Sequence, residues 1–190
     1  MTPRLSQAFQ YAAELHATQL RKGSRVPYVA HLMSVAGIVL HYGGSEDEAI
    51  AALLHDAVED QGGPATRAEI ERRFGTAVAA IVDGCTDADT IPKPPWRLRK
   101  EAYIAHVKEA SPSVRLVSAA DKLDNARSIL RDYRVVGESL WSRFTGGRDG
   151  TLWYYRSLVT VYRAAGDGVL VEELDRVVSE IERLAGPTSS

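Results

Sequence analysis

The sequence predicts an all-α protein, folded as a single domain of about eight to ten helices. Apolar side chains recur at three- and four-residue steps along nearly the whole chain, which is the spacing of one helix face. We find no convincing alternation of apolar and polar residues that would indicate a half-buried strand. Of the 190 residues, 45% are hydrophobic, so the chain can bury a sizeable core without a disulfide or a structural metal.

Glycine separates the first two expected helices. Apolar residues at helical spacing run from about Arg4 to Leu20, and Gly23 marks the end of this helix. Pro27 then marks the entry to a second helix, which is expected at about 28–42. The pair Gly43-Gly44 breaks the pattern and ends the second helix.

A third helix is expected at about 46–59, and it is apolar on most of its sides. Ser45 is a good N-cap for it, and Glu48 lies three residues further on, as in a capping box. A helix this apolar is expected at the centre of the domain. After a turn, Thr66 has the pattern of a cap for a short fourth helix, with Glu69 at the capping-box position.

The second half of the chain continues the helical pattern. Gly75 precedes a helix expected at about 76–85, and the three prolines of 86–96 predict a loop. The remaining helices are expected at about 98–110, 113–133, 150–165 and 169–184. The stretch 135–148 mixes glycines with aromatic residues and has no clear assignment, and the tail after residue 184 is expected to fray.

The overall charge gives no support for nucleic-acid binding, because the net charge is −2 and strong binders carry a basic excess. The charge is nevertheless uneven along the chain. Between residues 127 and 163, seven arginines accompany three acidic residues. This local excess fits an anionic ligand and a solvated helix surface equally well.

The cysteine content and the N-terminal residues bear on the compartment. Cys85 is the one cysteine, so no intramolecular disulfide can form, in keeping with a reducing cytosol. The first ten residues carry charge and lack the apolar segment of a signal peptide. No apolar run approaches the roughly 20 residues that span a bilayer. We expect a soluble, cytoplasmic protein with no nucleic-acid or membrane partner, and the sequence leaves its oligomeric state open.

His55 and Asp56 stand side by side inside the apolar third helix. Burying an ionisable pair there is costly unless something compensates the charge. A divalent metal compensates it, because the metal pairs with the carboxylate and binds the imidazole nitrogen. Neighbouring residues on a helix diverge by about 100°, so both reach one ion if it sits off the helix edge between them. Two residues cannot complete a coordination shell, and further ligands must come from other helices.

His31 and Asp121 are the further candidate ligands. His31 lies in the first turns of the second expected helix, and Asp121 follows a run of small apolar residues. Together with His55 and Asp56 they supply two imidazoles and two carboxylates. This donor set suits a borderline-to-hard cation with octahedral preference, such as manganese, with water at the open positions.

The order His31, His55-Asp56, Asp121 resembles the motif of the HD-domain superfamily of metal-dependent phosphohydrolases. Four segments around these residues are similar to the hydrolase domain of RelA/SpoT proteins, namely 21–31, 51–60, 74–86 and 119–128. The resemblance covers roughly residues 4–165 and leaves no room after it for a synthetase domain. The chain is therefore similar to a stand-alone small alarmone hydrolase, with residues 1–190 as a single HD hydrolase domain.

The resemblance implies manganese-dependent removal of the 3′-pyrophosphate of the guanosine alarmone (p)ppGpp. The implied metal ligands are His31, His55, Asp56 and Asp121. Glu59 and Asp60 would handle the attacking water and the proton, and each lies four residues after a ligand, on the same face of the expected helix. The residues that match nucleotide and phosphate positions of the family are Arg21, Lys22, Asn125 and Ser128.

Two departures leave the base of the alarmone open, guanosine or adenosine. Leu32 stands where the family usually has proline, and Lys122 stands where it usually has arginine. An HD phosphatase for another nucleotide, such as NADPH or a 5′-nucleotide, is the alternative enzyme. A nucleotide-binding module without turnover is the alternative outside catalysis.

Several polar residues belong to no motif. The histidines expected to be surface or satisfied residues are His16, His41 and His106. The aspartates expected to be caps or structural residues are Asp83, Asp87 and Asp124. We expect the basic run 92–100 to be an ordinary exposed loop, with a lid over the substrate phosphates as its alternative.

Overall fold

The computed structural model describes residues 1–86, 94–166 and 168–186 and confirms an all-α fold. Within these ranges no strand is assigned, and Leu20 and Pro27 form an isolated bridge. No described helix combines the length and the apolar character that a membrane span requires. The elements are α1 (Pro3–Leu15), α2 (Val29–His41), α3 (Glu46–Leu54), α4 (Ala57–Asp60), α5 (Gly63–Phe74), α6 (Thr76–Cys85), α7 (Trp96–Glu109), α8 (Pro112–Val136), the 3-10 helix η1 (Gly137–Arg143), α9 (Gly147–Ala164) and α10 (Gly168–Ala185).

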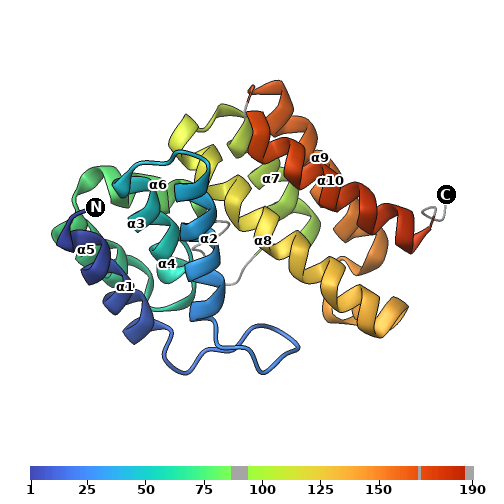
Figure 1. Cartoon of the computed structure of the whole chain (residues 1–190), viewed down its shortest axis with the longest axis horizontal. Coiled ribbons are helices and arrows are strands. Elements are labelled where there is room, and N and C mark those ends of the chain that lie inside the picture. Colours follow the sequence, from blue (N-terminus) through green and yellow to red (C-terminus); the bar gives the residue numbers. More distant parts are fainter. Residues whose placement is uncertain (87–93, 167, 187–190) are drawn as a thin grey trace.

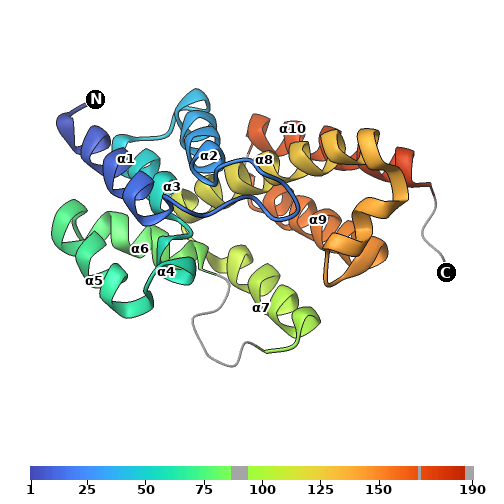
Figure 2. The same ribbon diagram turned by 90° about the horizontal axis from the view of Figure 1, so that it is seen from below.

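Helix α8 is the element around which the others are arranged. It is 25 residues long and runs between the N-terminal helices and the hairpin of α9 and α10 (Figure 1; Figure 2). It packs against α2, α3 and α6 at the N-terminal end of the molecule and against α10 at the other. Side chains from α2, from the end of α3 and from α8 can therefore meet in the interior.

Helix α3 occupies the centre that its apolar sequence predicts. All residues from Ala49 to Leu54 are buried, and α3 packs against α1, α2, α6 and α8. The predicted capping box is confirmed, because the Ser45 hydroxyl accepts from the Glu48 amide while the Glu48 carboxylate accepts from the Ser45 amide. The capped start and the buried faces fix the position of His55 and Asp56 at the end of this helix.

The first helix is shorter than expected, and this prediction is wrong by about a turn. Helix α1 ends at Leu15 instead of Leu20. The following residues form a loop in which the Arg21 amide donates to the Val26 carbonyl at 2.8 Å and the Tyr28 amide donates to the Gln19 carbonyl at 2.9 Å. These cross-loop bonds replace the intrahelical ones. Gly23, at φ +72°, forms the tight turn that reverses the chain direction in this loop.

The third expected helix is broken at the chemically important pair. Helix α3 ends at Leu54, and the short helix α4 begins at Ala57. The His55 side chain bonds through Nδ1 to the Ala52 carbonyl at 2.8 Å, an oxygen that accepts from the Asp56 amide in a continuous helix. The resulting turn lets the adjacent His55 and Asp56 side chains face the same space, which a straight helix would separate.

Other helix boundaries also differ from those that the sequence predicts. Helix α5 begins at Gly63, and Thr66 lies inside it, where its hydroxyl donates to the Gln61 carbonyl instead of capping the helix. The unassigned stretch after residue 134 contains the end of α8 and the 3-10 helix η1. Most of the loop expected at 86–96, including Asp87, and the end of the expected frayed tail lie outside the described residues.

Candidate active site

The four predicted metal ligands converge in the interior. His31 comes from α2, His55 and Asp56 come from the turn between α3 and α4, and Asp121 comes from α8. The Nε2 atom of His31 lies 3.2 Å from Oδ1 of Asp121, and Nε2 of His55 lies 3.0 Å from Oδ2 of Asp56 and 3.6 Å from Oδ1 of Asp121. Donor atoms of His31, His55 and Asp56 all lie within 4.8 Å of one another.

A hydrogen bond from the Nδ1 atom orients each of the two imidazole rings. His31 donates from Nδ1 to Oδ2 of Asp124 at 2.6 Å, and His55 donates from Nδ1 to the Ala52 carbonyl at 2.8 Å. The two Nε2 atoms are buried and have no hydrogen-bond partner among the described residues. The Nε2 atom of each ring therefore directs a lone pair toward carboxylate oxygens. Because lone pairs and carboxylates are all hydrogen-bond acceptors, the group requires a cation or a proton between its members. The donor set fits a divalent cation.

The pKa shifts of the titratable groups in the cluster are also those expected of a cation site. Burial opposes the charge on Asp56, but the neighbouring His55 imidazole outweighs it and lowers the pKa of the Asp56 carboxyl. Burial likewise opposes the charge on Asp121, and the Lys122 ammonium holds the pKa of that carboxyl well below its usual range. Burial disfavours imidazolium at His55, yet the two carboxylates raise the pKa of His55. A proton and a metal cation thus compete for the same space.

Both carboxylates also contact side chains outside the four predicted ligands. Tyr28 donates its hydroxyl to Oδ2 of Asp56, and burial, followed by the charge of Asp56, raises the pKa of Tyr28 far above its ordinary value. The Lys122 ammonium lies 2.6 Å from Oδ2 of Asp121. These contacts fix both carboxylates in orientation, which keeps Oδ1 of Asp121 directed at the two imidazoles.

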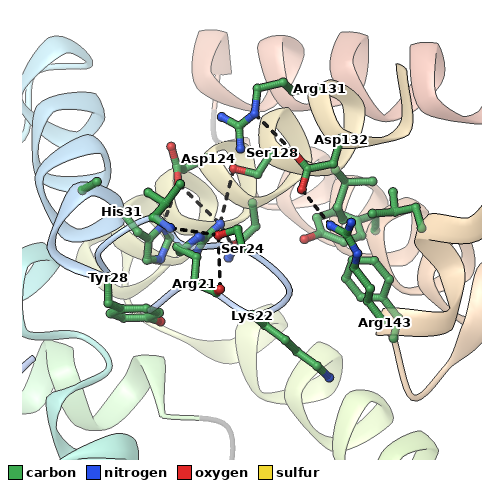
Figure 3. Close-up of a pocket in the computed structure, with 17 residues that line it drawn as sticks. Arg21, Lys22, Ser24, Tyr28, His31, Asp124, Ser128, Arg131, Asp132 and Arg143 are labelled. Atoms are coloured by element: carbon green, nitrogen blue, oxygen red, sulfur yellow. Dashed lines mark hydrogen bonds and ion pairs between the residues drawn. The ribbon is translucent and has the colours of Figure 1, made fainter. Parts of the chain in front are cut away.

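A cavity of about 380 Å³ opens beside the cluster (Figure 3). Its walls include His31 and Asp124 at the end near the cluster. Four cationic side chains also line it, namely Arg21, Lys22, Arg131 and Arg143. Its apolar wall is formed by Val26, Ile129, Leu140, Phe144 and Tyr155. The volume is in the range of small-molecule sites, and the combination of cationic and apolar walls suits a ligand with both phosphates and an aromatic base.

Three of the four predicted substrate residues are joined by hydrogen bonds. Nη2 of Arg21 donates to Oδ1 of Asn125 at 2.9 Å and contacts the Ser128 hydroxyl at 3.4 Å. Figure 3 shows Arg21 lying against α8 between Asp124 and Ser128, whereas Lys22 extends away from His31. Because α8 holds the guanidinium on the cavity wall, little side-chain freedom remains to be lost when an anion binds there.

Glu59 and Asp60 lie on α4, one turn beyond the ligand pair. Glu59 is half-buried and Asp60 is exposed. Asp60 accepts a hydrogen bond from Nε2 of Gln19 at 2.8 Å, and Oε1 of the same Gln19 accepts from Nδ1 of His16 at 2.6 Å. His16 is therefore buried and connected to a predicted catalytic residue, a role that the sequence did not suggest.

Asp124 and Tyr28 are the site residues that the sequence interpretation missed. Asp124 follows Asp121 by three residues on one helix and so shares its face, and Tyr28 precedes His31 by the same spacing. Helical spacing from a predicted ligand was the available signal. Of the two roles expected for Asp124, cap or structural residue, the structure supports the second, because Asp124 lies inside α8 and bonds to His31.

Comparisons with known proteins give consistent matches. The HD domain family matches residues 8–152. The guanosine-3′,5′-bis(diphosphate) 3′-pyrophosphohydrolase MESH1 of Xenopus tropicalis is 43% identical over 128 residues, which cover 66% of this chain and 69% of that protein. The human protein of the same name is 39% identical over 131 residues, covering 67% and 70% of the two chains. A solved structure of a metazoan ortholog of SpoT that hydrolyses ppGpp aligns with a TM-score of 0.77 at 27% identity, over 95% of this chain and 97% of that one.

Proposed function

The chain belongs to the HD domain family of phosphohydrolases, and from this we propose that it hydrolyses the 3′-pyrophosphate of guanosine alarmones with Mn²⁺ as its cofactor. Water and ppGpp would give GDP and pyrophosphate, and water and pppGpp would give GTP and pyrophosphate. The bond that breaks joins the 3′ oxygen of the ribose to the pyrophosphate. The relatives named for this reaction, at 43% and 39% identity, support the choice of substrate.

One observation carries the proposal. Two buried imidazole nitrogens face the buried carboxylate of Asp121 and the half-buried carboxylate of Asp56 without hydrogen bonds between them, beside a cavity lined by cationic side chains. In this proposal the cation is held by His31, His55, Asp56 and Asp121. A bound divalent cation supplies Lewis-acid activation of water and neutralises phosphate charge. Two nitrogen and two oxygen donors suit Mn²⁺, a borderline-to-hard ion.

Glu59 and Asp60 supply the proton-transfer groups in this proposal. Each follows a ligand by one turn of chain, so α4 carries both carboxylates beside the cluster. One orients the attacking water and the other moves a proton toward the departing 3′ oxygen. Gln19 restrains the Asp60 carboxylate through the 2.8 Å bond from its amide, which limits the loss of side-chain freedom during turnover.

Arg21, Lys22, Asn125 and Ser128 bind the substrate in this proposal. The guanidinium of Arg21 is directed along the cavity wall by Asn125 and Ser128, and a guanidinium can pair with phosphate in bidentate fashion. Lys22 adds a second positive charge at the cavity. In this proposal the four residues bind the phosphates and the ribose, and the base lies against the apolar wall. Because none of the four selects the base, adenosine alarmones belong among the substrates to be tested.

Product analysis tests the proposal. The protein is incubated with ppGpp, ppApp or NADPH, each with Mn²⁺, and the nucleotides are separated by ion-exchange chromatography. We expect GDP and pyrophosphate from ppGpp, and no product with EDTA or with Asp56→Ala. Release of inorganic phosphate from NADPH without GDP from ppGpp would instead identify a phosphatase for another nucleotide. Binding of ppGpp without any product would identify a nucleotide-binding module.

A further inference from the structure

Asp124 bonds directly to the cluster, and the proposed reaction does not use it. It lies on α8, one turn after Asp121, and its side chain is 16% exposed. Oδ2 accepts from Nδ1 of His31 at 2.6 Å, and Oδ1 accepts from the Ser34 hydroxyl. His31 and Ser34 are both on α2, so a single carboxylate receives two donors from one face of the neighbouring helix.

We propose that Asp124 is a positioning residue for the metal centre. Its carboxylate holds the imidazole hydrogen of His31 on Nδ1, so that the lone pair of Nε2 faces Asp56 and Asp121. The inference deepens the proposed function and rests on it, because it assumes that His31 ligates the cation. Carboxylate groups behind ligating histidines orient the ring and raise its basicity toward a metal.

The two histidines of the cluster differ in a way that supports this role. His55, directly after the end of α3, donates its Nδ1 hydrogen to the neutral carbonyl of Ala52 in that helix. His31 donates to a carboxylate on another helix, and Ser34 prevents that carboxylate from rotating away. A hydrogen bond to an ionised acceptor is roughly twice as strong as one to a neutral acceptor. The orientation of His31 therefore depends on one side chain that can be changed, whereas the orientation of His55 depends on the backbone.

Substrate recognition does not explain an acid at this position. Asp124 lines the cavity whose other charged side chains are mainly cationic, and a carboxylate there repels the phosphates of an alarmone. Arg21 lies 3.9 Å from Oδ2 of Asp124 and offsets part of this charge. The acid is accounted for by what it does to His31, since His31 and Ser34 are the groups that it contacts most closely.

Three variants separate positioning from a general structural contribution. Asp124→Leu removes the acceptor, Asp124→Asn keeps an acceptor of the same size without the charge, and Ser34→Ala removes the other hydrogen bond between α2 and α8. Mn²⁺ binding to the EDTA-treated protein is measured by calorimetry without nucleotide, and thermal unfolding confirms that each variant folds. The tautomer of His31 is read in the metal-free protein from the ¹⁵N chemical shifts of its ring.

We expect Asp124→Leu to weaken Mn²⁺ binding by roughly 10- to 100-fold and to move part of the His31 hydrogen to Nε2. Asp124→Asn should retain the Nδ1 tautomer and lose less affinity than Asp124→Leu, and Ser34→Ala should lose least. Wild-type affinity together with an unchanged His31 tautomer in Asp124→Leu would overturn the proposal. If the wild-type protein failed to bind Mn²⁺, the proposed metal centre would fall, and the tautomer measurement would still decide whether Asp124 positions His31.

Discussion

Two groups of titratable side chains in this molecule differ in the partners that they find within the chain. Between α9 and α10, the half-buried Asp175 of α10 pairs with Arg156 and Arg163 of α9, and every one of these groups has a partner of opposite charge. In the interior, His31 and His55 face two aspartates, and their Nε2 atoms lack a hydrogen-bond partner among the described residues. The group between α9 and α10 is complete within the chain, whereas the cluster around His31 and His55 would be completed by the proposed cation. The missing partners of the two imidazoles, and not the charge alone, distinguish the candidate site from the ion pairs of α9 and α10.

The arginines between residues 127 and 163 illustrate the same difference. Most of them are satisfied by α10, whose acidic residues follow the segment in sequence, so the local excess of positive charge disappears in the fold. Their partners in α10 are Glu173 for Arg127, Glu180 for Arg134, Asp175 and Glu182 for Arg156, Glu172 and Asp175 for Arg163, and the carbonyl of Ala185 for Arg148. Arg131 and Arg143 instead line the cavity, where both contact Asp132.

The largest expected effect comes from removing one carboxylate from each group. Asp56→Ala should reduce release of GDP from ppGpp to background, because the proposed cation loses a charged ligand and His55 loses its partner. The matched change Asp175→Ala should leave turnover unchanged and lower the free energy of unfolding by about 1 kcal/mol or less. Steady-state kinetics and urea unfolding of the two variants test this pair. Comparable loss of activity in both would remove the distinction between the two groups.

The proposed proton-transfer residues come next. Glu59→Gln and Asp60→Asn should keep Mn²⁺ binding and lower kcat by roughly 10²- to 10⁴-fold, which is the usual contribution of a general acid or base. Gln19→Leu, which frees the Asp60 carboxylate, should lower kcat by less and leave KM near its wild-type value. Calorimetry and steady-state kinetics measure both properties. Normal turnover by either carboxamide variant would show that its residue has no part in the chemistry.

A smaller effect is expected at the cavity wall. Arg21→Ala should raise KM for ppGpp by roughly 10- to 100-fold, since a hydrogen bond to a charged group contributes about 1.5–3 kcal/mol. Arg163→Ala removes an arginine that pairs with Glu172 and Asp175 on the surface, and it should leave KM unchanged. Equal KM values for wild type and Arg21→Ala would place the phosphates elsewhere.

The smallest effect is expected from acid titration of another ion pair of α10, that of Glu180. The Arg183 guanidinium, followed by Arg134, lowers the pKa of Glu180 from 4.5 to about 2. A lowered folded-state pKa stabilises the fold above the unfolded-state value, and this stabilisation is lost as the pH falls through the folded-state value. The difference in urea midpoint between wild type and Glu180→Gln should therefore be greatest above about pH 5 and shrink toward pH 2. A difference that does not change with pH would contradict it.

The sequence predicted the helical class and the identity of the four converging residues, because both depend on local patterns. Helical spacing is visible in any window of the chain, and a His-Asp pair inside an apolar helix is costly enough to attract notice. The break between α3 and α4 was missed, because the bond from His55 to the Ala52 carbonyl competes with an ordinary helical bond and leaves no pattern of apolar residues.

Long-range contacts account for the other differences. His16 was interpreted as a satisfied or surface residue, and its connection to Asp60 depends on the loop that returns Gln19 to α4. Asp124 was interpreted as structural, and its bond to His31 spans 93 positions of sequence. Helical spacing places Asp124 on the same face as Asp121, but it does not identify the partner of either residue, because each contact depends on how two separate elements pack. The roles assigned to Glu59, Asp60 and Arg21 stay predictions that the variants above decide.

The most direct test of the central claim, that the buried cluster is a divalent cation site, is an anomalous diffraction map from a crystal soaked in Mn²⁺. We predict one strong peak at bonding distance from Nε2 of both His31 and His55 and from the carboxylates of Asp56 and Asp121. No peak there, with Mn²⁺ bound elsewhere or not at all at a concentration that supports turnover, would contradict the account.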